Sequence, residues 1–141
     1  MAGANDFLRD ALMKSIFKNA AFTPATTLWV ALFTASPGSS GAGTEVTTVG
    51  TGYNRVNKTT ADWTTNGIGS FINNTAVSFT TAAATTWGTL THFAIVDSSV
   101  SSAGVAATTF YFWSTLSTNH VVNTGDAVQF SSGQLTVAMS S

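Results

Sequence analysis

The sequence predicts a mainly β protein: an antiparallel β-sandwich of jelly-roll type, preceded by one N-terminal amphipathic α-helix. Residues 23–141 form short apolar or alternating segments, separated by Gly, Pro and Asn turn signals at intervals of roughly a dozen residues. Residues 1–22 alone have helical periodicity. We therefore expect one domain, with an N-terminal helical arm at 1–22 and a β body at 23–141.

The helix has start and stop signals. Asn5 or Asp6 is suited to cap its N-terminus, where an acid also complements the helix dipole. Pro24 and the neighbouring hydroxyl residues predict an end near Ala21. One stripe at helical spacing is expected to pack on the β body, and it consists of Leu8, Ala11, Leu12 and Ile16.

Large apolar residues also occur outside this stripe. Met13 and Phe17 fall on the opposite, charged side of the helix, and Phe7 lies between the two sides. A helix that serves only its own core would keep its far side polar. We therefore predict that Phe7, Met13 and Phe17 dock against a partner.

The first strand is expected at residues 28–34, which are apolar at every position but the last, as in a strand buried on both faces. A long irregular loop with five glycines follows at 35–52. We predict that it adapts to contacts through Pro37, Gly38, Gly41 and Gly43. Further strands are expected at 53–60, 76–80, 91–97, 108–115, 127–130 and 135–139, with a turn at Asn66-Gly67.

Charged residues make up only 8% of the chain, against about 25% in an average domain. The net charge is −1 and no Lys or Arg follows Lys58, which argues against nucleic acid as a partner. A surface with so little charge is typical of an oligomer, or of a subunit whose surface is largely covered by contacts. A secreted neutral domain is the plainer alternative.

No signal-peptide core is expected, because charges interrupt the first residues, and no apolar run is long enough to span a membrane. The chain has no cysteine, which excludes thiol chemistry.

The chain is poor in catalytic groups, and we expect no enzyme activity, cofactor or metal site. The two histidines, His92 and His120, lie in a predicted strand and a predicted loop, with no nucleophile motif nearby. Asp97 is five residues from His92, which places the two on opposite faces of one strand. Trp63 and Trp87 lie near turns and are the tryptophans best placed to be exposed, so they are candidates for stacking on a glycan.

Several motifs recur in a known order: VALFTASPG, GTGYNRV, WGTLTHFAIVD and the closing VNTGDAVQFSSGQLTVAMS. In this order the body, at residues 28–139, resembles a family of small bacteriophage virion structural proteins that are often labelled tail fibre-like. Its size and sandwich body are also similar to those of capsid cement, or decoration, proteins. That similarity implies a homo-oligomer, either a trimer or a dimer. The helix at 1–22 departs from the family pattern.

The resemblance implies a virion structural protein. The first expectation is a cement protein on the capsid surface that binds the major capsid protein and reinforces contacts between capsomers. The alternative is a tail or tail-fibre component that contacts host glycan. A non-viral neutral β domain is the third interpretation.

Overall fold

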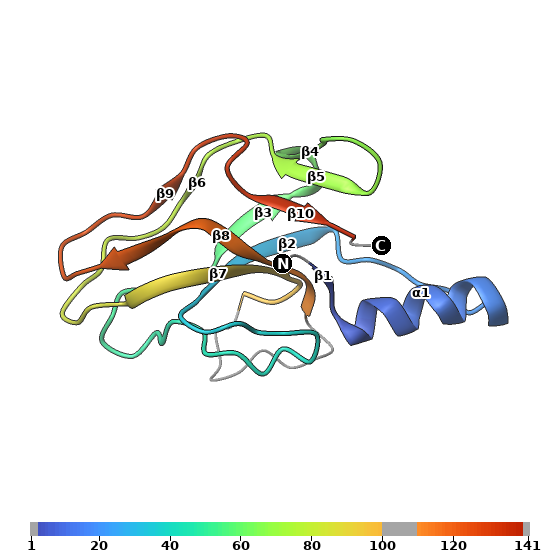
Figure 1. Cartoon of the computed structure of the whole chain (residues 1–141), viewed down its shortest axis with the longest axis horizontal. Coiled ribbons are helices and arrows are strands. Elements are labelled where there is room, and N and C mark those ends of the chain that lie inside the picture. Colours follow the sequence, from blue (N-terminus) through green and yellow to red (C-terminus); the bar gives the residue numbers. More distant parts are fainter. Residues whose placement is uncertain (1–2, 100–109, 140–141) are drawn as a thin grey trace.

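A computed structural model describes residues 3–99 and 110–139, and it is an antiparallel β-sandwich with one projecting helix (Figure 1). The larger layer is a five-stranded sheet in the order β1-β8-β7-β2-β3, in which every neighbouring pair is antiparallel. Its strands are β1 (Gly3–Ala4), β8 (Phe110–Val122), β7 (Gly88–Val96), β2 (Thr27–Phe33) and β3 (Val56–Thr59).

The facing layer is made of two small antiparallel sheets. One has the order β10-β5-β4 and the other pairs β6 with β9. The strands are β4 (Trp63–Thr65), β5 (Ser70–Asn73), β6 (Val77–Ser78), β9 (Gln129–Phe130) and β10 (Thr136–Ala138), and a short 3-10 turn, η1 (Thr60–Asp62), precedes β4. The predicted sandwich with one preceding helix is confirmed.

Strand β2 is apolar on both faces because both of its faces are covered. Val30 and Leu32 point into the core between the layers, whereas Ala31 and Phe33 join a second buried cluster on the other face of the large sheet. All four are fully buried. This is the burial predicted for residues 28–34.

The other predicted strands are present, with different lengths. Strand β8 continues to Val122, well past the predicted end at residue 115, and residues 108–109 of that prediction lie outside the described part of the chain. Strand β1 was not predicted, since two small residues carry no strand pattern; it forms because Gly3 and Ala4 pair with Trp113 and Phe112. The Asn66-Gly67 turn joins β4 to β5, with Gly67 at φ 105°.

Helix α1 (Asp6–Lys18) begins where predicted and ends earlier than predicted. The Asn5 side chain accepts a hydrogen bond from the Leu8 backbone N–H at 3.1 Å, so Asn5 is the N-cap. Asn19 adopts the left-handed conformation (φ 48°) and terminates the helix, well before Pro24. The predicted end near Ala21 is wrong because Asn tolerates this conformation and supplied the stop.

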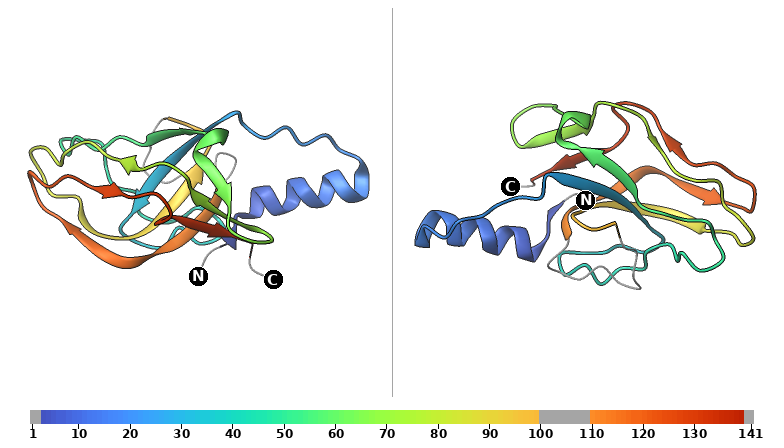
Figure 2. Two further views of the ribbon diagram at one scale, coloured as in Figure 1. Left: turned by 90° about the horizontal axis from the view of Figure 1, so that it is seen from above. Right: turned by 180° about the vertical axis from the view of Figure 1, so that it is seen from behind.

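Only the base of α1 packs on the body. Leu8 is buried and Ala11 and Leu12 are half-buried, but Ile16 is 73% exposed. The prediction that Ile16 fastens the helix to the body is therefore wrong. Figure 2 shows the reason: the helix extends outward past the edge of the β body.

The 3-10 turn η1 is held by Asp62. Its carboxylate accepts hydrogen bonds from the Thr75 hydroxyl at 2.6 Å and from the Thr59 backbone N–H at 2.8 Å. The Thr75 bond, followed by the Thr59 bond, lowers the pKa of Asp62 below its ordinary value. The carboxylate thus links β3 and η1 to the segment before β6.

These contacts predict an acid-sensitive contribution to stability. A group whose folded-state pKa is depressed stabilises the fold above its unfolded-state pKa, and that stability is lost as the pH falls through the folded-state value. In Asp62→Asn, unfolding free energy measured by urea titration should therefore fall less steeply between about pH 5 and pH 2 than in the wild type. Asp10→Asn, on the exposed side of α1, should retain the wild-type slope; equal slopes in wild type and Asp62→Asn would contradict the assignment.

Candidate assembly site

The far end of α1 carries an exposed apolar surface, which we call the helix-tip patch: Met13, Ile16 and Phe17. Their exposed fractions are 54%, 73% and 75%. The three positions are spaced i, i+3 and i+4, so they share one face of the helix. Large apolar side chains gathered on a projecting element are typical of an interaction surface.

The two predicted docking residues Met13 and Phe17 therefore lie on this patch, and Ile16 joins them. Phe7 does not. It is half-buried at the base of the helix, with its ring 6.3 Å from that of Tyr111. The prediction that Met13 and Phe17 lie opposite Ile16 is wrong, because at 3.6 residues per turn Ile16 is a neighbour of both. Ile16 was assigned to the packed stripe because the helical angle does not reveal where the helix leaves the body.

The charges on α1 are mostly paired with one another. Asp6 pairs with Arg9, and Asp10 pairs with Lys14 at 2.6 Å. Within residues 3–99 and 110–139, Lys18 in the last turn makes no ion pair. The tip of the helix is thus apolar on one face and positively charged at its end.

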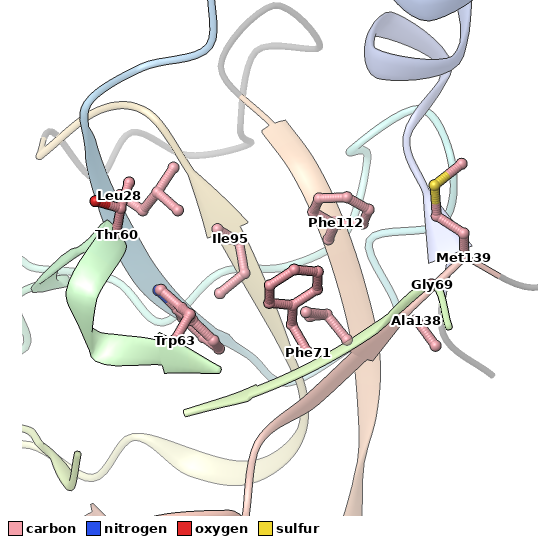
Figure 3. Close-up of a pocket in the computed structure, with 10 residues that line it drawn as sticks. Leu28, Thr60, Trp63, Gly69, Phe71, Ile95, Phe112, Ala138 and Met139 are labelled. Carbon is pink, nitrogen blue, oxygen red and sulfur yellow. The ribbon is translucent and has the colours of Figure 1, made fainter. Parts of the chain in front are cut away.

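A second apolar surface lies between the layers, and we call it the inter-sheet hollow (Figure 3). It is a cavity of about 290 Å³, partly open to the surface, between the large sheet and the β10-β5-β4 sheet. Its lining residues are Leu28, Thr60, Trp63, Gly69, Phe71, Ile95, Phe112, Val137, Ala138 and Met139. None of them is ionisable, and Phe71 and Met139 leave about half of their side chains exposed (45% and 52%).

The hollow was not predicted. In the strand expected at 135–139, Leu135, Val137 and Met139 alternate with Thr136 and Ala138, and Leu135 and Val137 are buried. Met139, directly after β10, instead lines the hollow and stays 52% exposed. Phe71 follows the Asn66-Gly67 turn in the sequence, but its place in the hollow depends on the pairing of β5 with β10.

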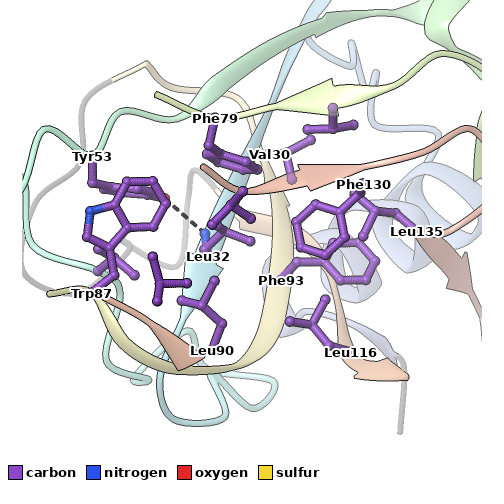
Figure 4. Packing of buried hydrophobic residues seen from close by; sticks show 14 of the residues in the cluster. Val30, Leu32, Tyr53, Phe79, Trp87, Leu90, Phe93, Leu116, Phe130 and Leu135 are labelled. Atoms are coloured by element: carbon purple, nitrogen blue, oxygen red, sulfur yellow. Dashed lines mark hydrogen bonds between the residues drawn. The ribbon is translucent and has the colours of Figure 1, made fainter. Parts of the chain in front are cut away.

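The two candidate glycan-contact tryptophans have different surroundings. Trp87 is 4% exposed, donates its indole N–H to the Thr51 carbonyl at 2.9 Å and packs edge-on against Tyr53 (Figure 4). The expectation that Trp87 is exposed is wrong, because the chain around Thr51 folds over it. Trp63 is half-buried and lines the hollow, and its indole nitrogen is buried without a hydrogen-bond partner among the described residues.

The glycine-rich segment 35–52 is irregular as predicted, but much of it is packed. Pro37 and Gly41 are buried, and a Cβ on Gly43 would lie 2.5 Å from the Pro37 Cα. Gly38 is half-buried, with φ 59° and open space around it. Of the four residues predicted to form an adaptable contact loop, Gly38 is therefore the least constrained by neighbours.

The histidines lie apart from both surfaces. His92 is half-buried beside Trp113, and burial lowers its pKa. His120 is exposed in β8, with its ring 5.8 Å from that of Phe130. In the part of the chain that the structure describes, no group of three His, Cys, Asp or Glu side chains is arranged to hold a metal, and no helix has the length and apolar character to cross a membrane.

Comparison with known proteins gives one family. The family model described as Podophage GP4 fiber I protein gp80 matches residues 3–138. The match includes α1, so the prediction that the helix departs from the family pattern is wrong. No curated protein matches the chain.

Proposed function

The chain belongs to the phage family described as Podophage GP4 fiber I protein gp80, and we propose that it is a fibre subunit assembled through its projecting helix. Membership makes it a bacteriophage structural protein with a place in the virion. The finer role, a subunit of a fibre rather than of the capsid shell, is the proposal. The family description supports it.

One observation carries the assembly role: the helix-tip patch is apolar, large and uncovered. Full burial of one large apolar side chain stabilises a protein by about 1.5–3 kcal/mol relative to its exposure to water. The three side chains of the patch do not make this contribution while they stay exposed. A helix of 13 residues is also only marginally stable without packing along its length. Both features are accounted for if the outer half of α1 is covered in the assembled particle.

The original expectation, a capsid decoration protein bound to the major capsid protein, is the second candidate. It is favoured by the same projecting helix, which could insert between capsomers, and by a surface with few charges. The family match is compatible with both roles. Host-glycan contact has weaker support, since Trp87 is buried and Trp63 is half-buried in the hollow.

Fractionated particles distinguish the two roles. Quantitative mass spectrometry on purified virions, on heads lacking tails and on isolated tails measures the copy number of the chain in each. A fibre subunit should occur in the tail fraction in a small number of copies and be absent from tail-less heads. Copies in stoichiometric amounts on tail-less heads would contradict the fibre role and support decoration.

A further inference from the structure

We propose that the helix-tip patch of one chain binds in the inter-sheet hollow of a second copy of the same chain. Neighbouring copies would then be joined head to tail, each inserting its helix and receiving another. The inference deepens the proposed function by naming the partner of α1, and it rests on that function only for its biological setting. Its evidence is the shape, chemistry and charge of the two surfaces.

The two surfaces of a single chain are held apart. The base of α1 is fixed because Asn5 is fully buried, its N–H donates to the Tyr111 carbonyl at 2.9 Å, and Leu8 is buried. At 1.5 Å per residue, Phe17 lies about 18 Å along the helix from Asn5. Figures 1 and 2 agree that the helix runs outward from the β body. The patch therefore meets a hollow only on another copy.

The hollow has the size and chemistry for this patch. A dry apolar cavity of about 150 Å³ is sufficient to bind benzene, which is the size of a phenylalanine ring. The inter-sheet hollow is about 290 Å³ and is lined by aromatic and aliphatic side chains. It has room for the Phe17 ring together with the Ile16 or Met13 side chain. Phe71 and Met139 at its mouth would be covered by the incoming helix.

The charges near the two surfaces do not oppose a contact between copies. The incoming helix end carries Lys18, which is unpaired in the described residues, whereas no lining residue of the hollow is charged. Next to the hollow, η1 ends at Asp62, whose side chain is 23% exposed and already pairs with Lys58 of the same chain at 3.8 Å. The cations of the body do not oppose Lys18, because Arg55 is buried against Glu45, and Lys58 is buried and bonded to Thr75 and Ala76.

The chemistry favours a second copy over an unrelated partner. A nucleic acid or an anionic surface would need a cationic stripe, and the paired charges on α1 do not form one. Every copy carries both complementary surfaces, so contact needs no other component. Such an interface is heterologous, and it closes into a ring or extends as a filament according to the angle between successive copies.

The test uses two variants of the isolated full chain, examined by analytical ultracentrifugation. The first, Ile16→Ser/Phe17→Ser, removes the patch and keeps the hollow. The second, Ala138→Phe, fills the hollow and keeps the patch. Val49→Ser is the matched control, because Val49 is an apolar residue that is 82% exposed elsewhere on the surface. Circular dichroism and thermal unfolding verify that each variant is folded.

The wild type and the control should self-associate, and each of the two variants alone should self-associate about 30-fold more weakly or not at all, as expected when hot-spot side chains are removed. An equimolar mixture of the two variants should form a heterodimer and stop there, since one intact patch and one intact hollow remain. Self-association of Ala138→Phe alone would overturn the proposal in favour of symmetric helix pairing. A wild type that stays monomeric, or a mixture without a heterodimer, would also overturn it.

A cross-link gives an independent measurement that does not depend on affinity. The chain has no cysteine, so single cysteines introduced by Phe17→Cys and Met139→Cys are the sole thiols in their chains. Mixing the two under mild oxidation should give a covalent dimer faster than Phe17→Cys paired with Val49→Cys. Equal rates would overturn the docking. These results concern the isolated chain, so they remain separate from the copy numbers that test the fibre role.

Discussion

Glu45→Ala should destabilise the protein by about 3–5 kcal/mol, because it leaves a buried arginine without its counter-ion. Arg55 donates to both carboxylate oxygens of Glu45, at 2.8 Å and 2.7 Å, and both side chains are 1% exposed. Tyr53 donates its hydroxyl to the same carboxylate at 3.0 Å. Burial, and then the Glu45 charge, raise the pKa of Tyr53. One substitution thus removes the acceptor for two buried residues.

The measurement is urea unfolding followed by tryptophan fluorescence at neutral pH. Asp10→Ala is the matched control, since it also breaks an acid–base pair, but one whose side chains are more than half exposed. The control should cost about 0–1 kcal/mol, as exposed ion pairs contribute little. Costs of similar size in the two variants would mean that the Glu45–Arg55 pair is hydrated and does not hold the 34–55 segment to the body.

The second large effect compares two phenylalanines with opposite surroundings. Phe93 is 1% exposed between the layers, beside Leu32 and Phe130 (Figure 4), and Phe93→Ala should cost about 3–5 kcal/mol through lost burial and a cavity. Phe17→Ala changes a side chain that is 75% exposed, and it should alter the stability of the monomer by less than about 1 kcal/mol.

Thermal and chemical unfolding of both variants at a concentration where the chain is monomeric gives the comparison. Self-association, measured by analytical ultracentrifugation, provides the second readout. Phe17→Ala should weaken self-association, whereas folded Phe93→Ala should self-associate like the wild type, because it leaves the helix-tip patch unchanged. A loss of about 3–5 kcal/mol in monomeric Phe17→Ala would mean that Phe17 is part of the core and has no docking role.

Local rules explain the features that were predictable. Residues 28–34 are apolar at successive positions, and only a strand covered on both faces tolerates that pattern, so β2 followed from the sequence. Asn5 predicted the helix start because its side chain satisfies an N–H three residues later. The virion family followed from recurring motifs, and the family match extends that assignment to residues 3–138.

Other features depend on contacts between distant parts of the chain. Arg55 was visible as one of two cations outside the helix, but its burial depends on Glu45 in the preceding loop and on the Ser98 carbonyl, which accepts from Arg55 at 2.9 Å. Trp87 lies near a turn, which favours exposure, yet the segment around Thr51 covers it. Sequence spacing does not determine which segment folds over which.

By itself the sequence determined that this protein is a β-sandwich with one capped helix, few charges and a virion family resemblance, because strand alternation, capping and composition are local properties. Only the tertiary structure decided that Ile16 is exposed with Met13 and Phe17, since that depends on where α1 leaves the body. It also decided that Leu28, Phe71 and Met139, from three separate strands or strand ends, line one hollow, because a cavity exists only where two layers fail to cover each other.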